Sequence, residues 1–244
     1  MRKILAYPLT VIYFIFFGLI LVIFHPIQWF CFNVFGYQAH KKSVDALNYC
    51  LTYSLLLLGN RVSFRNKYKI ATDKPCIVVA NHQSMYDISP IIWNMRNHHP
   101  KFISKKELGK GIPSISYNLR HGGSALIDRK DRDQALKAII NLANYAKENN
   151  RSVVIFPEGT RSRDGKPKPF QTGGLKILLK KLPDAQVVPI SINNSWKTLR
   201  YGKFPMGIGA HLTFDVHEPM GARDLPLEEL IAKIETTISS NINY

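Results

Sequence analysis

The chain has 244 residues, enough for one sizeable α/β domain with a small additional segment. Its 45% apolar and 20% charged residues are typical of a folded protein and exclude extended disorder. The 33 Lys and Arg residues outnumber the 17 Asp and Glu residues, and the resulting net charge of +16 indicates a polyanionic partner: a nucleic acid, an anionic membrane or a phosphorylated substrate.

The N-terminus is strongly apolar. Ile4–Phe24 contains no charged residue, and as a helix it would be roughly 31 Å long, close to the ~30 Å hydrocarbon core of a bilayer. The segment is too long for the apolar part of a signal peptide, and no small-residue cleavage site follows it. Aromatic residues are frequent over 29–37, which suits a membrane–water interface.

A second apolar segment, Val44–Gly59, would be about 24 Å long as a helix and carries Asp45. It is too short to span a bilayer comfortably. Three arrangements follow. Ile4–Phe24 spans alone, or the two segments form a hairpin that enters one leaflet, or both are core helices of a soluble domain.

The basic excess lies mostly after residue 60, where the net charge is +13. Each Lys or Arg beside an anionic leaflet contributes about 1 kcal/mol of attraction, so an apolar anchor and a basic domain together explain the charge. The sequence has no recognisable nucleic-acid motif, and we expect no nucleic-acid partner. We predict a membrane-associated helical anchor over 1–60 and a catalytic domain over 61–244.

Strand and helix patterns alternate from residue 61 onward. Buried strands are predicted at CIVVA and SVVIF, further strands at KFIS, SALID and QVVPISIN, an edge-like strand within NRVSFRNKYKI, and a strand with one exposed face within HLTFDVHEPM. Helices are predicted at 88–96, 131–148, 173–181 and from Pro226 onward. This alternation predicts an α/β fold with a central mixed, partly parallel sheet flanked by helices.

Polar clusters follow three of the predicted strands. Because sites in α/β sheets form at the carboxyl ends of strands, their shared position is informative. After CIVVA, His82 precedes Asp87 by five residues, a spacing that suits a turn entering a helix. The carboxylate can then hold one imidazole nitrogen and leave the other as a base, although a purely structural pair fits the spacing equally well. Ser84 lacks a GxSxG elbow, and we predict a turn role for it.

The other two clusters contain Arg129, after SALI, and PEGTR, after SVVIF. Arg129 and Arg161 can each bind a phosphate with two hydrogen bonds. Glu158 can bind a hydroxyl group, and Gly159 lets backbone approach a ligand.

Neither a metal nor a bound cofactor is expected. The three cysteines form no CxxC pair, no Cys/His cluster has zinc spacing, and neither GxxxxGK[ST] nor GxGxxG occurs.

The segments NHQSMYD, SALIDR, FPEGTRS and VVPISI have the order and spacing of the four motifs of the glycerolipid acyltransferase family. Over about residues 60–220 the chain resembles the bacterial 1-acylglycerol-3-phosphate acyltransferases of that family. The resemblance implies transfer of an acyl chain from acyl-CoA or acyl carrier protein to the sn-2 hydroxyl of 1-acyl-sn-glycerol-3-phosphate (lysophosphatidic acid). The product would be phosphatidic acid, with no acyl-enzyme intermediate.

The resemblance also implies roles for individual residues. His82 would deprotonate the hydroxyl, and Asp87 would orient it. Arg129, Arg161 and Lys105 would bind the phosphate, and Glu158 and Gly159 would position the glycerol. Val188, Pro189 and Ile190 would line the acyl-chain side, a role not separable from core packing. The second motif differs from the usual pattern, because Ser124-Ala125-Leu126 stands where a bulky residue is common.

Acyl thioesters are made in the cytoplasm, so the resemblance places the protein at the inner membrane with its catalytic domain facing the cytoplasm. This favours the hairpin, or another single-leaflet anchor, over one crossing helix. Alternative functions are acyl transfer to another lyso acceptor such as a lyso-aminolipid, a hydrolase using His82 to activate water, and a non-enzymatic basic membrane-binding protein.

Overall fold

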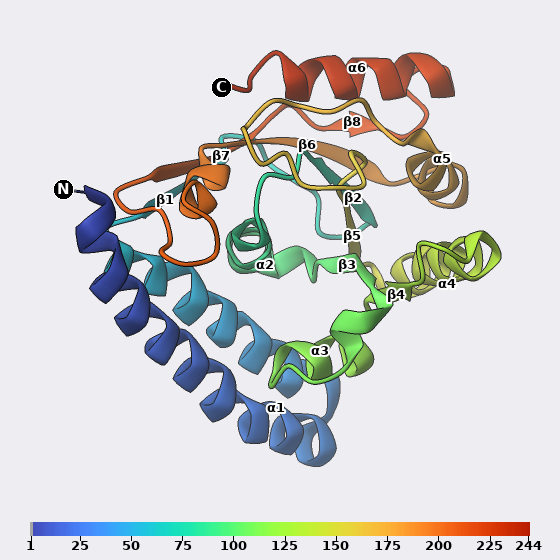
Figure 1. Cartoon of the computed structure of the whole chain (residues 1–244). Helices are drawn as coiled ribbons and strands as arrows, with labels where there is room; N and C mark the ends of the chain where they lie inside the picture. The colour runs from blue at the N-terminus through green and yellow to red at the C-terminus, as the bar shows by residue number, and fades with distance from the viewer. Residues whose placement is uncertain (1) are drawn as a thin grey trace.

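The protein begins with a helical hairpin, as the computed structural model of residues 2–244 shows (Figure 1). Helical bonding runs through α1, Arg2–Ser54, but the chain reverses at Gly36, whose φ of 74° and ψ of −163° lie in a region that favours glycine. A 3₁₀ turn, Leu55–Leu58, extends the second arm. The two apolar segments thus form the two arms of a hairpin, and the first arm includes the aromatic stretch before Gly36. The entry of this hairpin into one leaflet stays a prediction.

The outer surface of this hairpin is apolar and open to solvent. α1 and the 3₁₀ turn together are long and apolar enough to cross a membrane, yet only 17% of the most apolar window is buried. A core helix of a soluble domain would be mostly buried, so the exposed strip calls for another apolar partner. Its most exposed large side chains are Ile4, Leu5, Ile15, Val22, Ile23, Trp29, Val34 and Phe35.

Within residues 2–244, eight strands form one mixed sheet, which confirms the predicted sheet class. They are β1 (Arg61–Arg65), β2 (Cys76–Ala80), β3 (Lys101–Lys105), β4 (Ala125–Ile127), β5 (Ser152–Ile155), β6 (Gln186–Asn193), β7 (His211–Val216) and β8 (Met220–Gly221). The order is β1-β7-β6-β2-β5-β3-β4, and β8 pairs with β6. Only β6–β7 and β6–β8 are antiparallel; the other pairs are parallel.

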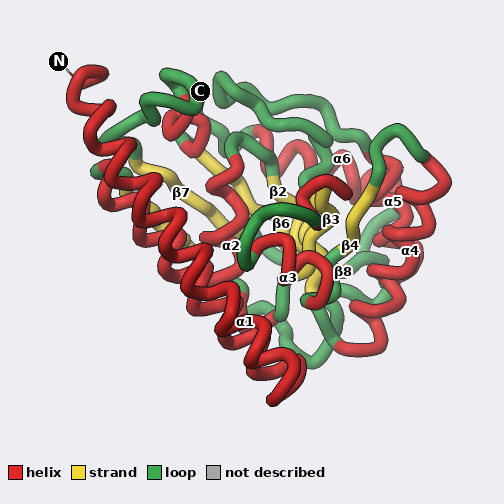
Figure 2. Tube along the Cα trace, turned by 60° about the horizontal axis from the view of Figure 1, so that its bottom comes forward, coloured by secondary structure: helices red, strands yellow, loops and turns green. Residues whose placement is uncertain are grey.

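Helices cover both faces of the sheet (Figures 1 and 2). The hairpin, α2 (Ile88–Asn94) and α3 (Ile115–His121) lie on one side, and α4 (Arg132–Asn149), α5 (Thr172–Lys181) and α6 (Leu227–Ser239) on the other. The predicted helices all form within a few residues of their expected bounds. α3 was not predicted, because its seven residues follow a Gly- and Pro-rich stretch and show no clear periodicity.

Each face of the sheet has its own apolar core, as the two-residue period of strands requires. On the hairpin face, Val78 and Ala80 of β2 belong to one buried cluster with Tyr13 and Leu55 of the N-terminal segment. On the opposite face, Ile77 of β2 belongs to a second cluster, with side chains of α4, α5 and α6. β2 is buried at every position because it lies in the middle of a sheet covered on both sides. The hairpin is therefore packed onto the sheet and shares its core.

Candidate active site

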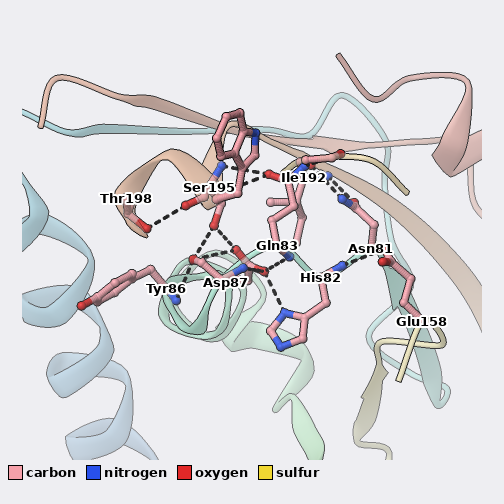
Figure 3. Close-up of polar contacts among 12 residues, drawn as sticks. Asn81, His82, Gln83, Tyr86, Asp87, Glu158, Ile192, Ser195 and Thr198 are labelled. Atoms are coloured by element: carbon pink, nitrogen blue, oxygen red, sulfur yellow. Dashed lines mark hydrogen bonds and ion pairs between the residues drawn. The ribbon is translucent and has the colours of Figure 1, made fainter. Parts of the chain in front are cut away.

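His82 and Asp87 form a hydrogen-bonded pair directly after β2 (Figure 3). The distance from His82 Nδ1 to Asp87 Oδ2 is 2.8 Å. Asp87 is completely buried, whereas 17% of the His82 side chain is exposed. A carboxylate accepts hydrogen bonds, so Nδ1 carries the proton and Nε2 is left free as an acceptor.

Asp87 is held by several donors besides His82. Its Oδ2 accepts hydrogen bonds from the backbone N–H groups of Gln83 (2.8 Å) and Ser84 (2.9 Å). Its Oδ1 accepts from the hydroxyl groups of Ser195 and Ser84. Ser84 also caps the short 3₁₀ turn Met85–Asp87 that leads into α2, in a capping box with Asp87. The turn role predicted for Ser84 is thus what the structure shows.

Two amide side chains fix the loop between β2 and this turn. Asn81 exchanges two hydrogen bonds with the backbone of Ile192 on β6, at 2.9 and 2.6 Å. The side-chain Oε1 of Gln83 accepts a hydrogen bond from the backbone N–H of Ser195 at 2.9 Å. Both side chains are buried, so the loop that carries His82 is tied to β6 and to the segment after it. The roles of Gln83 and Ser195 were missed in the sequence, since Ser195 lies 112 positions from Gln83 and 108 positions from Asp87.

The other side of His82 is fixed by the segment after β5. The ring of Phe156 stacks on the imidazole, with centroids 4.2 Å apart and planes at 16°. The backbone N–H of Ser162 donates to the carbonyl of His82 at 2.7 Å. His82 therefore has a fixed ring plane and a fixed backbone, which a positioned base requires.

Glu158 binds the backbone of His82 and does not face the cavity described below. Its carboxyl group accepts from the backbone N–H groups of His82 (3.1 Å) and Lys168 (3.3 Å), and the residue is 4% exposed. Glu158 does not line this cavity, and its contact with glycerol stays a prediction. The carboxyl group is used to join two loops that would otherwise leave buried N–H groups unpaired. Gly159, with a φ of 67°, does face the cavity described below.

Burial raises the pKa of Glu158 to about 7, although its hydrogen bonds with the backbone of His82 and Lys168 oppose the shift. The fold therefore favours the protonated form. We expect the free energy of unfolding to fall by about 2 kcal/mol as the pH rises from about 4.5 to 7. In this range the carboxyl group is ionised in the unfolded chain but is still protonated in the folded protein. Urea unfolding across this range would show the decline. In Glu158→Gln this part of the pH dependence should vanish; an identical pH profile for both proteins would contradict the assignment.

A cavity of about 920 Å³ lies between the hairpin, α2, α3 and the carboxyl ends of the parallel strands. His82, Lys105, Arg129, Gly159 and Arg161 all line it. The structure thus brings together residues predicted from three separate strand ends. Arg163 and Lys168 line it too and were not predicted. In the described chain the lining contains seven Lys and Arg side chains and a single carboxylate, which makes it suited to anionic ligands.

The wall between these polar residues is apolar. It contains side chains of the second hairpin arm, of α2 and of β3, among them Val44, Leu51, Leu55, Ile88, Ile92 and Phe102. At the far end Lys101 is 6% exposed, and burial, together with the nearby Arg151 and Lys41, lowers its pKa to about 7. The cavity therefore combines a cationic mouth beside His82 with an apolar wall and a buried lysine at its far end. The first two features are the pattern expected for a site that binds an amphiphile with an anionic head.

Val188, Pro189 and Ile190 do not line the cavity. They lie on β6, between β2 and β7, and Val188 and Ile190 are fully buried in the core cluster on the hairpin face. Of the two roles that the sequence left open, the structure shows core packing. The strand pattern alone does not show whether a buried face contacts a cavity or a helix.

Comparison with known proteins identifies the family of this chain. A sequence model of the family described as Acyltransferase matches residues 61–193, more than half of the chain. The chain belongs to the Acyltransferase family. The match begins at β1 and ends with β6, and it includes all three strand-end clusters.

Several acyltransferases are similar over part of the chain. The 1-acyl-sn-glycerol-3-phosphate acyltransferase of Helicobacter pylori is 40% identical over 128 residues, which cover 50% of this chain and 49% of that protein. The protein of the same name from Salmonella typhimurium is 28% identical over 62% of this chain and 60% of its own length. The chain thus spans about half the length of the H. pylori relative.

Similarity to a solved structure covers almost the whole chain. The crystal structure of the 1-acyl-sn-glycerophosphate acyltransferase PlsC from Thermotoga maritima superposes with a TM-score of 0.81 and 27% identity. The match covers 98% of this chain and 95% of that one, so it includes the N-terminal hairpin as well as the sheet.

Proposed function

We propose that this acyltransferase transfers an acyl chain from an acyl thioester to the sn-2 hydroxyl of 1-acyl-sn-glycerol-3-phosphate, giving phosphatidic acid. The supporting observation is the fixed His82–Asp87 pair at the cationic mouth of an apolar cavity. The names of the similar proteins agree with this acceptor. The donor, acyl-CoA or acyl carrier protein, carries an already activated acyl group, so the proposed reaction needs neither a metal nor a bound cofactor.

In the proposed mechanism His82 acts as a general base. Its Nε2 takes the proton of the acceptor hydroxyl while the oxygen attacks the thioester carbonyl carbon. A carbon–oxygen bond forms, the carbon–sulfur bond breaks, and the leaving thiolate takes the proton from His82. Asp87 keeps the proton of the resting imidazole on Nδ1 and stabilises the imidazolium that forms in between.

Arg129, Arg161 and Lys105 are proposed to hold the acceptor phosphate. Replacing Arg129 or Arg161 by Gln removes a charge-assisted hydrogen bond, and we expect KM for lysophosphatidic acid to rise about 10- to 100-fold. The control is Arg223→Gln, because Arg223 is exposed and pairs with Asp184 on the surface. Initial rates at varied acceptor concentration measure the effect. An unchanged KM in both cavity variants would remove these residues from the phosphate site.

The decisive assay supplies the detergent-purified protein with acyl-CoA and acyl carrier protein thioesters. The acceptors are lysophosphatidic acid and a lyso-aminolipid. Formation of phosphatidic acid supports the proposal, and the rates with the two donors identify the thioester used. Transfer only to the lyso-aminolipid would assign the other acceptor class. Release of free fatty acid without acyl transfer would indicate a hydrolase, and no turnover of any donor by folded protein would contradict an acyltransferase activity.

The exposed apolar strip of the hairpin is proposed to lie in one leaflet of the inner membrane, with residues 61–244 on the cytoplasmic side. The position suits a membrane-borne acceptor and a cytoplasmic thioester. We expect single cysteines placed at exposed sites after residue 61 to react with a membrane-impermeant maleimide only in inverted vesicles. Labelling from the outside of intact spheroplasts would contradict this orientation.

A further inference from the structure

The loop after the 3₁₀ turn Ser195–Leu199 exposes a large aromatic side chain. Phe204 is 52% exposed and makes an edge contact with Tyr7 of α1, with ring centroids 5.5 Å apart. Ile4 and Leu5, on the same first turns of α1, are 72% and 59% exposed. Phe204 thus continues the exposed apolar strip of the hairpin onto a segment some 200 positions away in the sequence.

This loop is fixed against the hairpin. The backbone N–H of Met206 donates to Thr10 Oγ1 at 2.9 Å, and the Asn60 side chain donates to the carbonyl of Gly207 at 3.0 Å. The N–H of Gly207 donates to the carbonyl of Thr198 at 2.8 Å. Figure 1 shows the loop beside the first turns of α1. Buried hydrogen bonds therefore fix the chain shortly after Phe204 against the hairpin.

Cationic side chains lie on the same loop as the exposed Phe204 ring. Arg200 and Lys203 are exposed on the loop, and the guanidinium of Arg200 lies 5.1 Å from the ring centroid of Tyr201. Lys3 of α1 approaches the same ring at 6.0 Å. The sequence has no acidic residue between Asp184 and Asp215. A loop that exposes an aromatic ring, carries cations and has no acidic residue matches the interface of an anionic bilayer, where rings enter the headgroup region and cations bind phosphates.

We propose that the loop of residues 200–205 is a second membrane-contacting element, which lies on an anionic phospholipid surface beside the first turns of α1. This rests on the proposed function insofar as the acceptor is drawn from the membrane. A hairpin lying in a leaflet can still roll about its own axis. A contact outside the hairpin removes that freedom and sets the direction in which the mouth of the cavity faces.

The charge part of the proposal is tested with Arg200→Gln/Lys203→Gln and sedimentation with mixed phosphatidylcholine–phosphatidylglycerol vesicles. Each cation is worth roughly a fivefold change in partition coefficient, so we expect the double variant to bind about 25-fold more weakly. The control is Lys180→Gln/Lys181→Gln at the end of α5, which removes the same charge from an exposed site on the opposite face of the sheet. Equal loss in both variants would show a general effect of net charge and overturn the proposal.

The contact itself is tested with an environment-sensitive fluorophore on Phe204→Cys. The background is Cys31→Ser/Cys50→Ser, because these two cysteines are partly exposed and would also be labelled, whereas Cys76 is buried and can stay. On vesicles we expect a blue-shifted emission and quenching by nitroxide lipids, and neither change for a label at Lys180→Cys. A label at 204 that stays in water while the protein sediments with vesicles overturns the proposal.

A protein partner gives a different result. If Arg200→Gln/Lys203→Gln keeps its vesicle binding but has a higher KM for an acyl carrier protein thioester, the loop of residues 200–205 binds an acidic protein and the proposal fails. Vesicle binding needs no catalysis, so the binding result tests this proposal even if the protein transfers no acyl chain. In detergent with dispersed substrates the double variant should keep the wild-type kcat.

Discussion

Replacing His82 with alanine is expected to lower kcat for acyl transfer by about 10²–10⁴-fold, because it removes the group that accepts the hydroxyl proton. KM for lysophosphatidic acid should change little, since the cations at the mouth of the cavity remain. The fold should be kept, because Asp87 still accepts hydrogen bonds from Gln83 and Ser84. Steady-state kinetics together with a thermal unfolding curve measure both effects.

The matched control is His211→Ala. His211 is exposed on β7 and its ring forms a hydrogen bond with Ser63 at the surface, so kcat should remain at the wild-type value. A His82→Ala protein that folds and retains more than about a tenth of the wild-type kcat would show that the hydroxyl proton leaves by another route. The proposed mechanism would then be wrong even if the substrates were right.

Much of the fold could be predicted because its signals are local. The buried run CIVVA and the apolar face of α4 each follow from the period of their side chains. The order of the strands is not local information. Nothing in β2 shows that it pairs with β5 and β6, and nothing in β7 shows that it runs antiparallel to β6 and parallel to β1. These pairings depend on contacts between segments far apart in the chain.

The candidate site could likewise be predicted only in part from the sequence. The sequence brought His82, Arg129 and Arg161 together because the carboxyl ends of parallel strands meet at one edge. It could not show the direction in which each side chain points. Glu158 turns inward to the backbone of His82 and Lys168, and Val188 faces the core, although both lie in recognisable motifs. Ser195 carries no motif, and only the fold places its hydroxyl on Asp87.

Asp87→Asn gives the second large effect, and the contacts predict how the new side chain must sit. The oxygen at the Oδ2 position faces three donors: His82 Nδ1 and the backbone N–H groups of Gln83 and Ser84. An NH₂ group there would leave these buried groups unpaired, at a cost of about 1–3 kcal/mol each. The amide NH₂ must therefore take the Oδ1 position, where the hydroxyl groups of Ser195 and Ser84 can accept from it.

In that orientation the amide oxygen still accepts from Nδ1, so His82 keeps the tautomer that leaves Nε2 free. What the variant loses is the negative charge that stabilises the imidazolium in a buried site. We therefore expect kcat to fall about 10²-fold, less than in His82→Ala, with a loss of about 1–3 kcal/mol in the free energy of unfolding. Ser195→Ala is the control, since it removes one donor from Oδ1 and keeps the charge, and it should lower kcat only a few-fold. A fully active Asp87→Asn protein would mean that the carboxylate shapes the loop and takes no part in the proton transfer. A loss as large as that of His82→Ala would instead mean that the amide has turned its NH₂ toward Nδ1 and forced the base into the wrong tautomer.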